Sequence, residues 1–282
     1  MRRTNNTLTN LSFPVVFPES LDFPTSPCQL LHLRIFLAAR CRRLWSCSAM
    51  TDVRYTLVLF DLDHTLLDFD ASESHALHIC WERFFKDVST FDDFGNVFRK
   101  INLRIWHEFE SGKLEPAHVS DERARRCLKH FGLSGGTAED LGKLYARGLG
   151  EVADWLPGAE EGFRNIADRY KVGLITNGLT EVQHPRLEAI GIKPLLATFQ
   201  VSEEIGIMKP RAEIFFKAMN EAESTASTTL MVGDSVSSDF QGALNAKIDF
   251  CWVKAGGHDL PVRFPKPNFQ VSTILQLDSL LP

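Results

Sequence analysis

Strand and helix patterns alternate along most of this chain, and the alternation begins with the short apolar run YTLVLF at residues 55–60. Further strands are expected at 171–176, 198–202, 229–233, 250–254 and 269–272, and helices are expected at 159–170, 180–190, 211–222, 238–246 and 273–281. Strands separated by helices build βαβ units, which form a parallel sheet. The sequence therefore predicts an α/β fold with a doubly wound parallel sheet.

A long helical block interrupts this alternation after the first strand. Residues 72–153 contain no convincing strand, and helical apolar spacing recurs at 76–85, 94–109 and 122–131. We therefore expect an inserted, all-helical cap domain at 71–153, over the end of the first strand. The catalytic core would consist of residues 50–70 and 154–282.

The first 49 residues differ from the rest. They contain four prolines, six Arg and no Lys, and Met50 follows them directly. This composition predicts an extension that is disordered or not translated, with Met50 as the working initiator. The alternative is an organelle-targeting segment, because such segments are rich in Arg and poor in acids.

Charge and hydropathy exclude several classes of partner. The net charge is −5, and because the first 49 residues are basic, the remainder is more acidic than this value. Nucleic-acid binding needs a basic surface, so we expect none. No apolar run is long enough to span a bilayer, and no two of the six Cys form a CxxC pair. We expect a cytoplasmic protein, monomeric or homodimeric, with no membrane partner.

Four short segments carry groups suited to phosphate chemistry. They are FDLDHTL (60–66), LITNG (174–178), MKP (208–210) and VGDSVSSD (232–239). Asp61, Thr176 and Asp234 each follow or end a predicted strand, and Lys209 lies in a loop between a strand and a helix. Ligands of open α/β sheets bind at the carboxyl ends of the strands, so all four side chains are expected in one crevice.

The residue types in this crevice match a phosphoryl transfer through an aspartyl-phosphate. One carboxylate of the Asp61 and Asp63 pair can attack phosphorus while the other protonates the leaving oxygen. Mg²⁺ prefers carboxylate oxygens, which Asp61 and Asp234 supply. Lys209 would offset the repulsion between nucleophile and phosphate. Each segment alone has a plainer interpretation as a turn, a loop or a helix start, and Thr65 alone could be a helix cap.

Together the segments resemble the haloacid dehalogenase superfamily, in its phosphatase branch with a helical cap, over residues 53–281. The resemblance implies a Rossmannoid core and a Mg²⁺-dependent hydrolase of small phosphate esters. It also implies the following roles: Asp61 as nucleophile, Asp63 as general acid and base with its carbonyl on the metal, Asp234 as metal ligand, Thr176, Asn177 and Lys209 as phosphate-binding residues, and Asp239 and Thr65 as supporting residues.

A closer resemblance is to the pyrimidine 5′-nucleotidases of house-cleaning type. It rests on DHTLLDFD (63–70), ITNGLTEVQHPRLEAIGI (175–192), SEEIGIMKPRAEIF (202–215) and MVGDSVSSDFQGALNAKIDFCWV (231–253). It implies hydrolysis of pyrimidine nucleoside 5′-monophosphates. The alternatives are an N-acylneuraminate-9-phosphatase or another sugar-phosphate phosphatase, a phosphomutase, which shares the Asp pair, and a non-catalytic scaffold.

The cap offers candidate substrate contacts at Phe69, Asn102, Trp106 and Arg123. Trp106 and Phe69 can stack on a base, although the helical spacing of Trp106 with Leu103 and Phe109 favours a place in the core. Arg123 lies in the charged run 121–126, which is most simply a solvated helix face.

Overall fold

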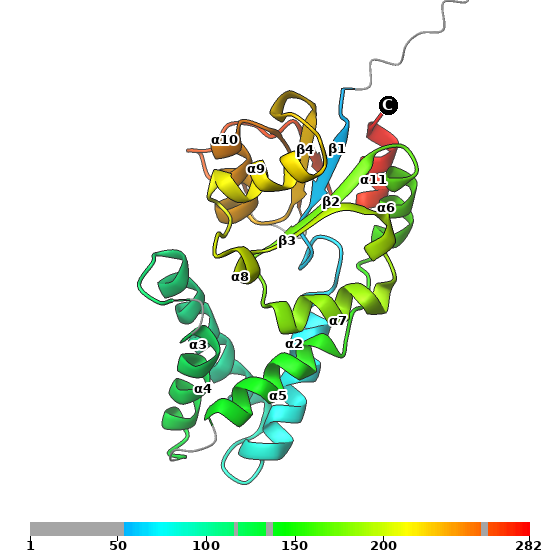
Figure 1. Cartoon of the computed structure of the whole chain (residues 1–282). Coiled ribbons are helices and arrows are strands. Elements are labelled where there is room, and N and C mark those ends of the chain that lie inside the picture. The colour runs from blue at the N-terminus through cyan, green and yellow to red at the C-terminus, as the bar shows by residue number, and fades with distance from the viewer. Residues whose placement is uncertain (1–53, 116–117, 134–137, 255–258) are drawn as a thin grey trace, which may run out of the picture. The chain divides into compact units, whose positions relative to one another are not determined.

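The computed structural model describes residues 54–115, 118–133, 138–254 and 259–282 (Figure 1). The predictions made for residues 1–49 lie outside these ranges. No helix in the described ranges is long and apolar enough to cross a membrane.

A six-stranded sheet forms the centre of the described chain. Every neighbouring pair of strands is parallel, in the order β3-β2-β1-β4-β5-β6. The strands are β1 (Leu57–Phe60), β2 (Lys171–Thr176), β3 (Leu196–Val201), β4 (Thr229–Gly233), β5 (Asp249–Val253) and β6 (Phe269–Val271). The prediction of a doubly wound parallel sheet is confirmed, and each predicted strand lies within two residues of the observed bounds.

Alternating side chains of β1 face two separate hydrophobic cores, as successive residues of a strand must. Val58 and Phe60 belong to the core that includes residues of α6 (Ala159–Ala167), α7 (Thr180–Ile190) and α11 (Ile274–Leu280). Leu57 and Leu59 belong to the core that includes residues of α9 (Ala212–Glu221) and α10 (Gln241–Ala246). Figure 1 shows α6 and α11 on one side of the sheet and α9 and α10 on the other. Because both faces are covered, β1 is apolar throughout.

The helices and single turns of this core have the following bounds: α6 (Ala159–Ala167), α7 (Thr180–Ile190), η3 (Lys193–Leu195), α8 (Ser202–Ile205), α9 (Ala212–Glu221), η4 (Ala226–Thr228), η5 (Val236–Phe240), α10 (Gln241–Ala246) and α11 (Ile274–Leu280).

The block between β1 and α6 is helical, as predicted. It contains α2 (Phe69–Cys80), the π-helix η1 (Trp81–Phe85), α3 (Phe91–Glu110), α4 (Val119–His130) and α5 (Ala138–Gly150). The apolar spacing did not single out α5, which contains Gly142 and Gly148. Both glycines mark close packing, because a Cβ atom would lie 2.7 Å from Ser120 Oγ at Gly142 and 2.8 Å from Ala76 Cα at Gly148.

Helix α7 connects the cap to the core. Val182, near its start, packs in the hydrophobic cluster of the cap helices, and Leu187 and Ile190, near its end, pack in the core beneath the sheet. The helix directly follows β2 and the TNG segment. Its position therefore ties the cap to the part of the chain that carries a predicted phosphate-binding motif.

The contact between α6 and α11 predicts a test of the core. At Gly162 of α6, a Cβ atom would lie 2.5 Å from the Leu275 backbone nitrogen and 2.6 Å from the Ile274 carbonyl carbon. Because both are main-chain atoms, Gly162→Ala must separate the helices and should lower the free energy of unfolding by about 1–3 kcal/mol in urea denaturation.

Gly95→Ala in α3 is the matched control, because its nearest neighbour is the flexible end of Arg99, at 3.3 Å. Better helix propensity should make this variant neutral or more stable by about 0.5–1 kcal/mol. Equal effects of the two substitutions would contradict the close packing of α6 on α11.

Candidate active site

The carboxyl ends of three adjacent strands bring the predicted motifs together. Asp61 follows β1, Asp234 follows β4, and Thr176 is the last residue of β2. These strands are neighbours in the sheet, and the Asp61 amide donates to the Val232 carbonyl at 2.9 Å. The expectation that these side chains share one crevice is met, because they all line one cleft.

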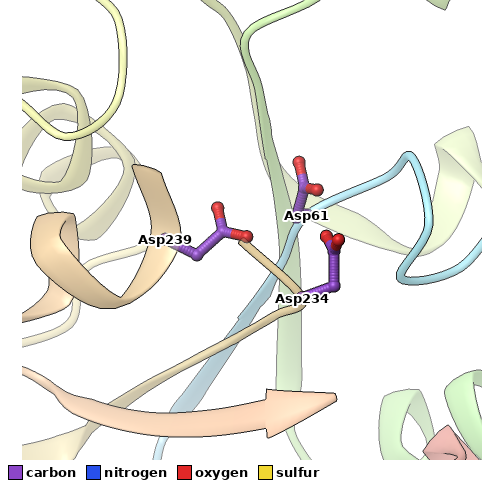
Figure 2. A group of neighbouring side chains, drawn as sticks. All are labelled: Asp61, Asp234 and Asp239. Carbon is purple, nitrogen blue, oxygen red and sulfur yellow. The ribbon is translucent and has the colours of Figure 1, made fainter. Parts of the chain in front are cut away.

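Three carboxylates gather at this edge. Oxygens of Asp61, Asp234 and Asp239 all lie within 4.8 Å of one another, and Figure 2 shows the three side chains converging from separate segments. Gly233 makes the close approach possible, since a Cβ atom there would lie 2.2 Å from Asp239 Oδ2. The same oxygen accepts from the Ser235 amide at 3.0 Å, which fixes Asp239 beside the end of β4.

Lys209 neutralises part of this charge from inside the fold. Its side chain is almost fully buried, and its Nζ lies 2.5 Å from Asp61 Oδ1 and 2.7 Å from Asp239 Oδ1. Asn177 holds the Lys209 main chain, accepting from its amide at 2.8 Å and donating to its carbonyl at 2.9 Å. Asn177 also lines the cleft, and its side-chain amide positions Lys209.

The carboxylates exceed the cations that face them. Burial raises the pKa of Asp61 to about 7, against the opposing effect of Lys209 and with a further rise from Asp239. Burial, with the neighbouring Asp61 charge, raises the pKa of Asp234 to about 6. Burial also raises the pKa of Asp239. These clustered carboxylates ionise less readily unless more positive charge is nearby. A divalent cation, which prefers oxygen ligands, would supply that charge.

Asp234 is oriented by hydrogen bonds on both sides. Its amide donates to Thr65 Oγ1 at 3.1 Å, and the Thr65 hydroxyl donates to Asp234 Oδ1 at 3.3 Å. The Trp252 indole donates to the Asp234 carbonyl at 3.0 Å. Asp68 caps α2, so Thr65 is not its cap.

Asp63 is held by two residues that the motif analysis did not identify. Gln183 Nε2 donates to Asp63 Oδ2 at 2.8 Å and to Thr176 Oγ1 at 3.1 Å. Arg186 is fully buried, and its Nη1 donates to Asp63 Oδ1, while its Nη2 donates to Ser72 Oγ at 3.3 Å. Gln183 and Arg186 are three residues apart on α7, and this spacing on a helix after a motif strand could have identified them.

A cleft of about 320 Å³ opens over these groups. Beside Asp61, Asp63, Thr176, Lys209 and Asp234, it is lined by residues that include His64, Phe69, Trp106 and Ser238. Phe69 and Trp106 are half-buried and lie at the cleft as candidate substrate contacts. The alternative that groups Trp106 with Leu103 in the core is wrong, because Leu103 is 73% exposed.

The interpretation of Arg123 as part of a solvated helix face is wrong. Arg123 is 3% exposed, and its Nη1 donates to Asn102 Oδ1 at 3.1 Å. Burial lowers its pKa. It lies one helical turn from Val119 and from Cys127, both buried, and this i, i+4 spacing was a signal for its inward position. Asn102 is also buried, on α3.

The raised pKa values predict how pH affects stability without metal. For Asp61 and Asp234 the folded-state values, about 7 and about 6, exceed the ordinary value of 3.8, so the folded state binds more protons than the unfolded state between about pH 4 and pH 7. Their contribution to stability is therefore present at low pH and is lost as pH rises through this window. In EDTA, the melting temperature should be a few degrees lower at pH 7.5 than at pH 5, and Mg²⁺ should restore it at pH 7.5.

Asp234→Asn isolates the effect from other titrating groups. It should flatten the pH dependence in EDTA and weaken the response to Mg²⁺. A wild-type protein whose melting temperature does not respond to Mg²⁺ at pH 7.5 would contradict a cation site among these carboxylates.

Comparison with known proteins identifies a family with this architecture. The profile of the family described as haloacid dehalogenase-like hydrolase matches residues 58–253. The HAD-hydrolase YfnB of Bacillus subtilis (strain 168) is 30% identical over 231 residues, which cover 81% of this chain and 96% of YfnB. A crystal structure of YfnB bound to magnesium aligns with a TM-score of 0.71, over 81% of this chain and 99% of that one.

Two further relatives carry a named activity. Pyrimidine 5′-nucleotidase YjjG of Escherichia coli (strain K12) is 29% identical over 81% of this chain and 99% of its own length. Pyrimidine 5′-nucleotidase PynA of Streptococcus pneumoniae (strain ATCC BAA-255 / R6) is 33% identical over 70% of this chain and 83% of its own length. The family profile spans most of the chain and the fold agrees, so the chain belongs to the haloacid dehalogenase-like hydrolase family.

Proposed function

We propose that this protein is a Mg²⁺-dependent phosphomonoesterase that forms an aspartyl-phosphate on Asp61 and acts on pyrimidine nucleoside 5′-monophosphates. The observation that carries the proposal is the arrangement around Asp61. Its carboxylate lines the cleft against the buried Lys209 ammonium, and Asp63 lines the same cleft. A nucleophile, a cation and a second carboxylate at one point are the groups that phosphoryl transfer needs.

In the first half-reaction, an oxygen of Asp61 attacks phosphorus and the bond to the leaving 5′-oxygen breaks. Asp63 gives its proton to that oxygen, so the nucleoside leaves as a neutral alcohol. Lys209 and Thr176 hold the phosphoryl oxygens, and the Asn177 side chain keeps Lys209 in place. A Mg²⁺ ion held by Asp61, Asp234 and the Asp63 carbonyl would supply positive charge beside the transferring group.

In the second half-reaction, Asp63 takes a proton from water as the water attacks the phosphorus of the aspartyl-phosphate. The bond between phosphorus and the Asp61 oxygen breaks, so Asp61 is regenerated and inorganic phosphate leaves. Gln183 and Arg186 contact both oxygens of Asp63 and hold its carboxyl group in place at the cleft. Asp239 supports Lys209 and the end of β4.

The substrate assignment rests on the relatives and on the size of the cleft. YjjG and PynA, both named pyrimidine 5′-nucleotidases, match most of this chain. A cleft of about 320 Å³ lies within the range of pockets that enclose small ligands, and Phe69 and Trp106 add aromatic walls. We also propose that the enzyme is cytoplasmic and is a monomer or a homodimer. Residues 71–153 form its cap, and a sugar phosphate is the alternative substrate.

Phosphate release from a panel of esters tests this proposal. The panel contains UMP, dUMP, dTMP, AMP, N-acylneuraminate 9-phosphate and ribose 5-phosphate, each with Mg²⁺ and then with EDTA. We expect metal-dependent release with the pyrimidine monophosphates preferred, and Asp61→Asn should lower kcat at least about a thousandfold, because the attacking oxygen is lost.

Asp70→Asn is a matched control, since Asp70 is an exposed carboxylate near the start of α2. It should retain wild-type activity. Preference for a sugar phosphate would overturn the substrate, and a folded protein that releases phosphate from none of these esters would overturn the hydrolase.

A further inference from the structure

A small recess of about 50 Å³ adjoins the main cleft, on the side of the cap. It shares Asp63, Phe69, Trp106 and Gly178 with the cleft, so the two cavities are neighbours. The other lining residues come from α3, α4, α5 and the start of α7: Asn102, Arg123, Tyr145, Leu149, Leu179, Val182 and Gln183.

Arg123 is the unexplained group in this recess. Its guanidinium stacks 4.5 Å from the centre of the Tyr145 ring, and its Nη1 donates to Asn102. Its Nη2 is buried and has no hydrogen-bond acceptor among the residues that the structure describes. A buried donor without a partner carries a desolvation penalty, so a charged side chain left in this state indicates a partner from outside the chain.

The walls of the recess limit what that partner can be. Leu149, Leu179 and Val182 are apolar, and Phe69 and Trp106 are aromatic, so most of the surface suits a flat and weakly polar group. The volume admits an oxygen and the edge of a ring, but it is too small for a whole nucleoside. The free guanidinium nitrogen is a donor only, so it requires an acceptor.

A charged acceptor fits this place less well than a neutral one. Burial lowers the pKa of Arg123, and the carboxylates of Glu73 and Glu181 act against this effect. A further carboxylate would be repelled by these two. A ring carbonyl needs only one donor, and the ring that carries it can pack against the aromatic side chains of the recess.

We propose that this recess binds the carbonyl edge of an uncharged, planar ring carried by the leaving group, of the pyrimidinone class, with Arg123 Nη2 donating to the ring oxygen. Asn102 fixes the guanidinium, and Trp106 contacts the ring where the recess meets the cleft. The inference rests on the proposed function, because it assumes that the phosphate lies at Asp61.

Binding to a variant that cannot turn over tests the recess apart from catalysis. In the Asp61→Asn full-length protein with Mg²⁺, calorimetric titration compares UMP with ribose 5-phosphate, which has the same phosphate and sugar but no base. UMP should bind about 10- to 100-fold more tightly, as expected for a hydrogen bond to a buried charged donor. Adding Arg123→Lys should weaken UMP by about the same factor and ribose 5-phosphate by less than about threefold.

Two further variants complete the design. Arg125→Lys is the matched control, because Arg125 lies on the same helix but is exposed and pairs with Asp121 and Glu122, so neither affinity should change. Asn102→Ala removes the support of the guanidinium without removing its charge, and should also weaken UMP selectively. It keeps the test decisive if Arg123→Lys fails to fold.

Each other outcome overturns the inference. Equal affinity for UMP and ribose 5-phosphate would mean that the recess does not bind the base. The same would follow if Arg123→Lys and Asn102→Ala each weakened both ligands by the same factor. If N-acylneuraminate 9-phosphate bound more tightly than UMP and its binding depended on Arg123, the acceptor in the recess would be a carboxylate and not a ring carbonyl. Failure of the proposed function would appear separately, as a wild-type protein that hydrolyses no ester although the binding preference persists.

Discussion

One buried ammonium organises the chemistry of this protein. Lys209 Nζ lies between Asp61 and Asp239, and so connects the end of β1 to η5 from the loop before α9. A buried ion pair is tolerated only when its charges are matched, yet here several carboxylates face a single lysine. Burial, with the charges of the neighbouring carboxylates, raises the pKa values of Asp61 and Asp234, and such a cluster has the chemistry that suits a divalent cation.

Helix α7 relates the cap to the acid and base of the proposed reaction. Gln183 and Arg186 contact Asp63, while Val182 packs with the cap helices and lines the recess beside Arg123. A ligand seated against the cap therefore contacts the same helix that holds the Asp63 carboxylate. This arrangement gives a physical route by which recognition of the leaving group can be coupled to its protonation.

Much of the core could be predicted from the sequence because it depends on local patterns. The apolar runs that end at Asp61, Thr176 and Asp234 are strands, and parallel neighbours necessarily bring their carboxyl ends to one edge. The gathering of these side chains at one edge follows from that rule. The sheet order and the contact of Lys209 with Asp239 needed the structure, because they join segments far apart in the chain.

The cap was less predictable for a physical reason. The charged run at 121–126 has both exposed members, such as Arg125, and a buried one, Arg123, and charge alone does not say which side of a helix faces inward. Arg123 lies buried against the Tyr145 ring and Asn102, which come from other helices. The partners of Asp63 were missed for the same reason, since Gln183 and Arg186 lie about 120 residues away.

The central claim, that phosphate passes through Asp61, is tested most directly by trapping the covalent intermediate. Asp63→Asn with p-nitrophenyl phosphate, whose leaving group needs no proton, should form the aspartyl-phosphate and hydrolyse it slowly. After an acid quench, peptide mass spectrometry should find one phosphoryl group on the peptide that contains Asp61, in step with a burst of p-nitrophenolate. Turnover without a burst, with no phosphoryl group on that peptide, would contradict the account.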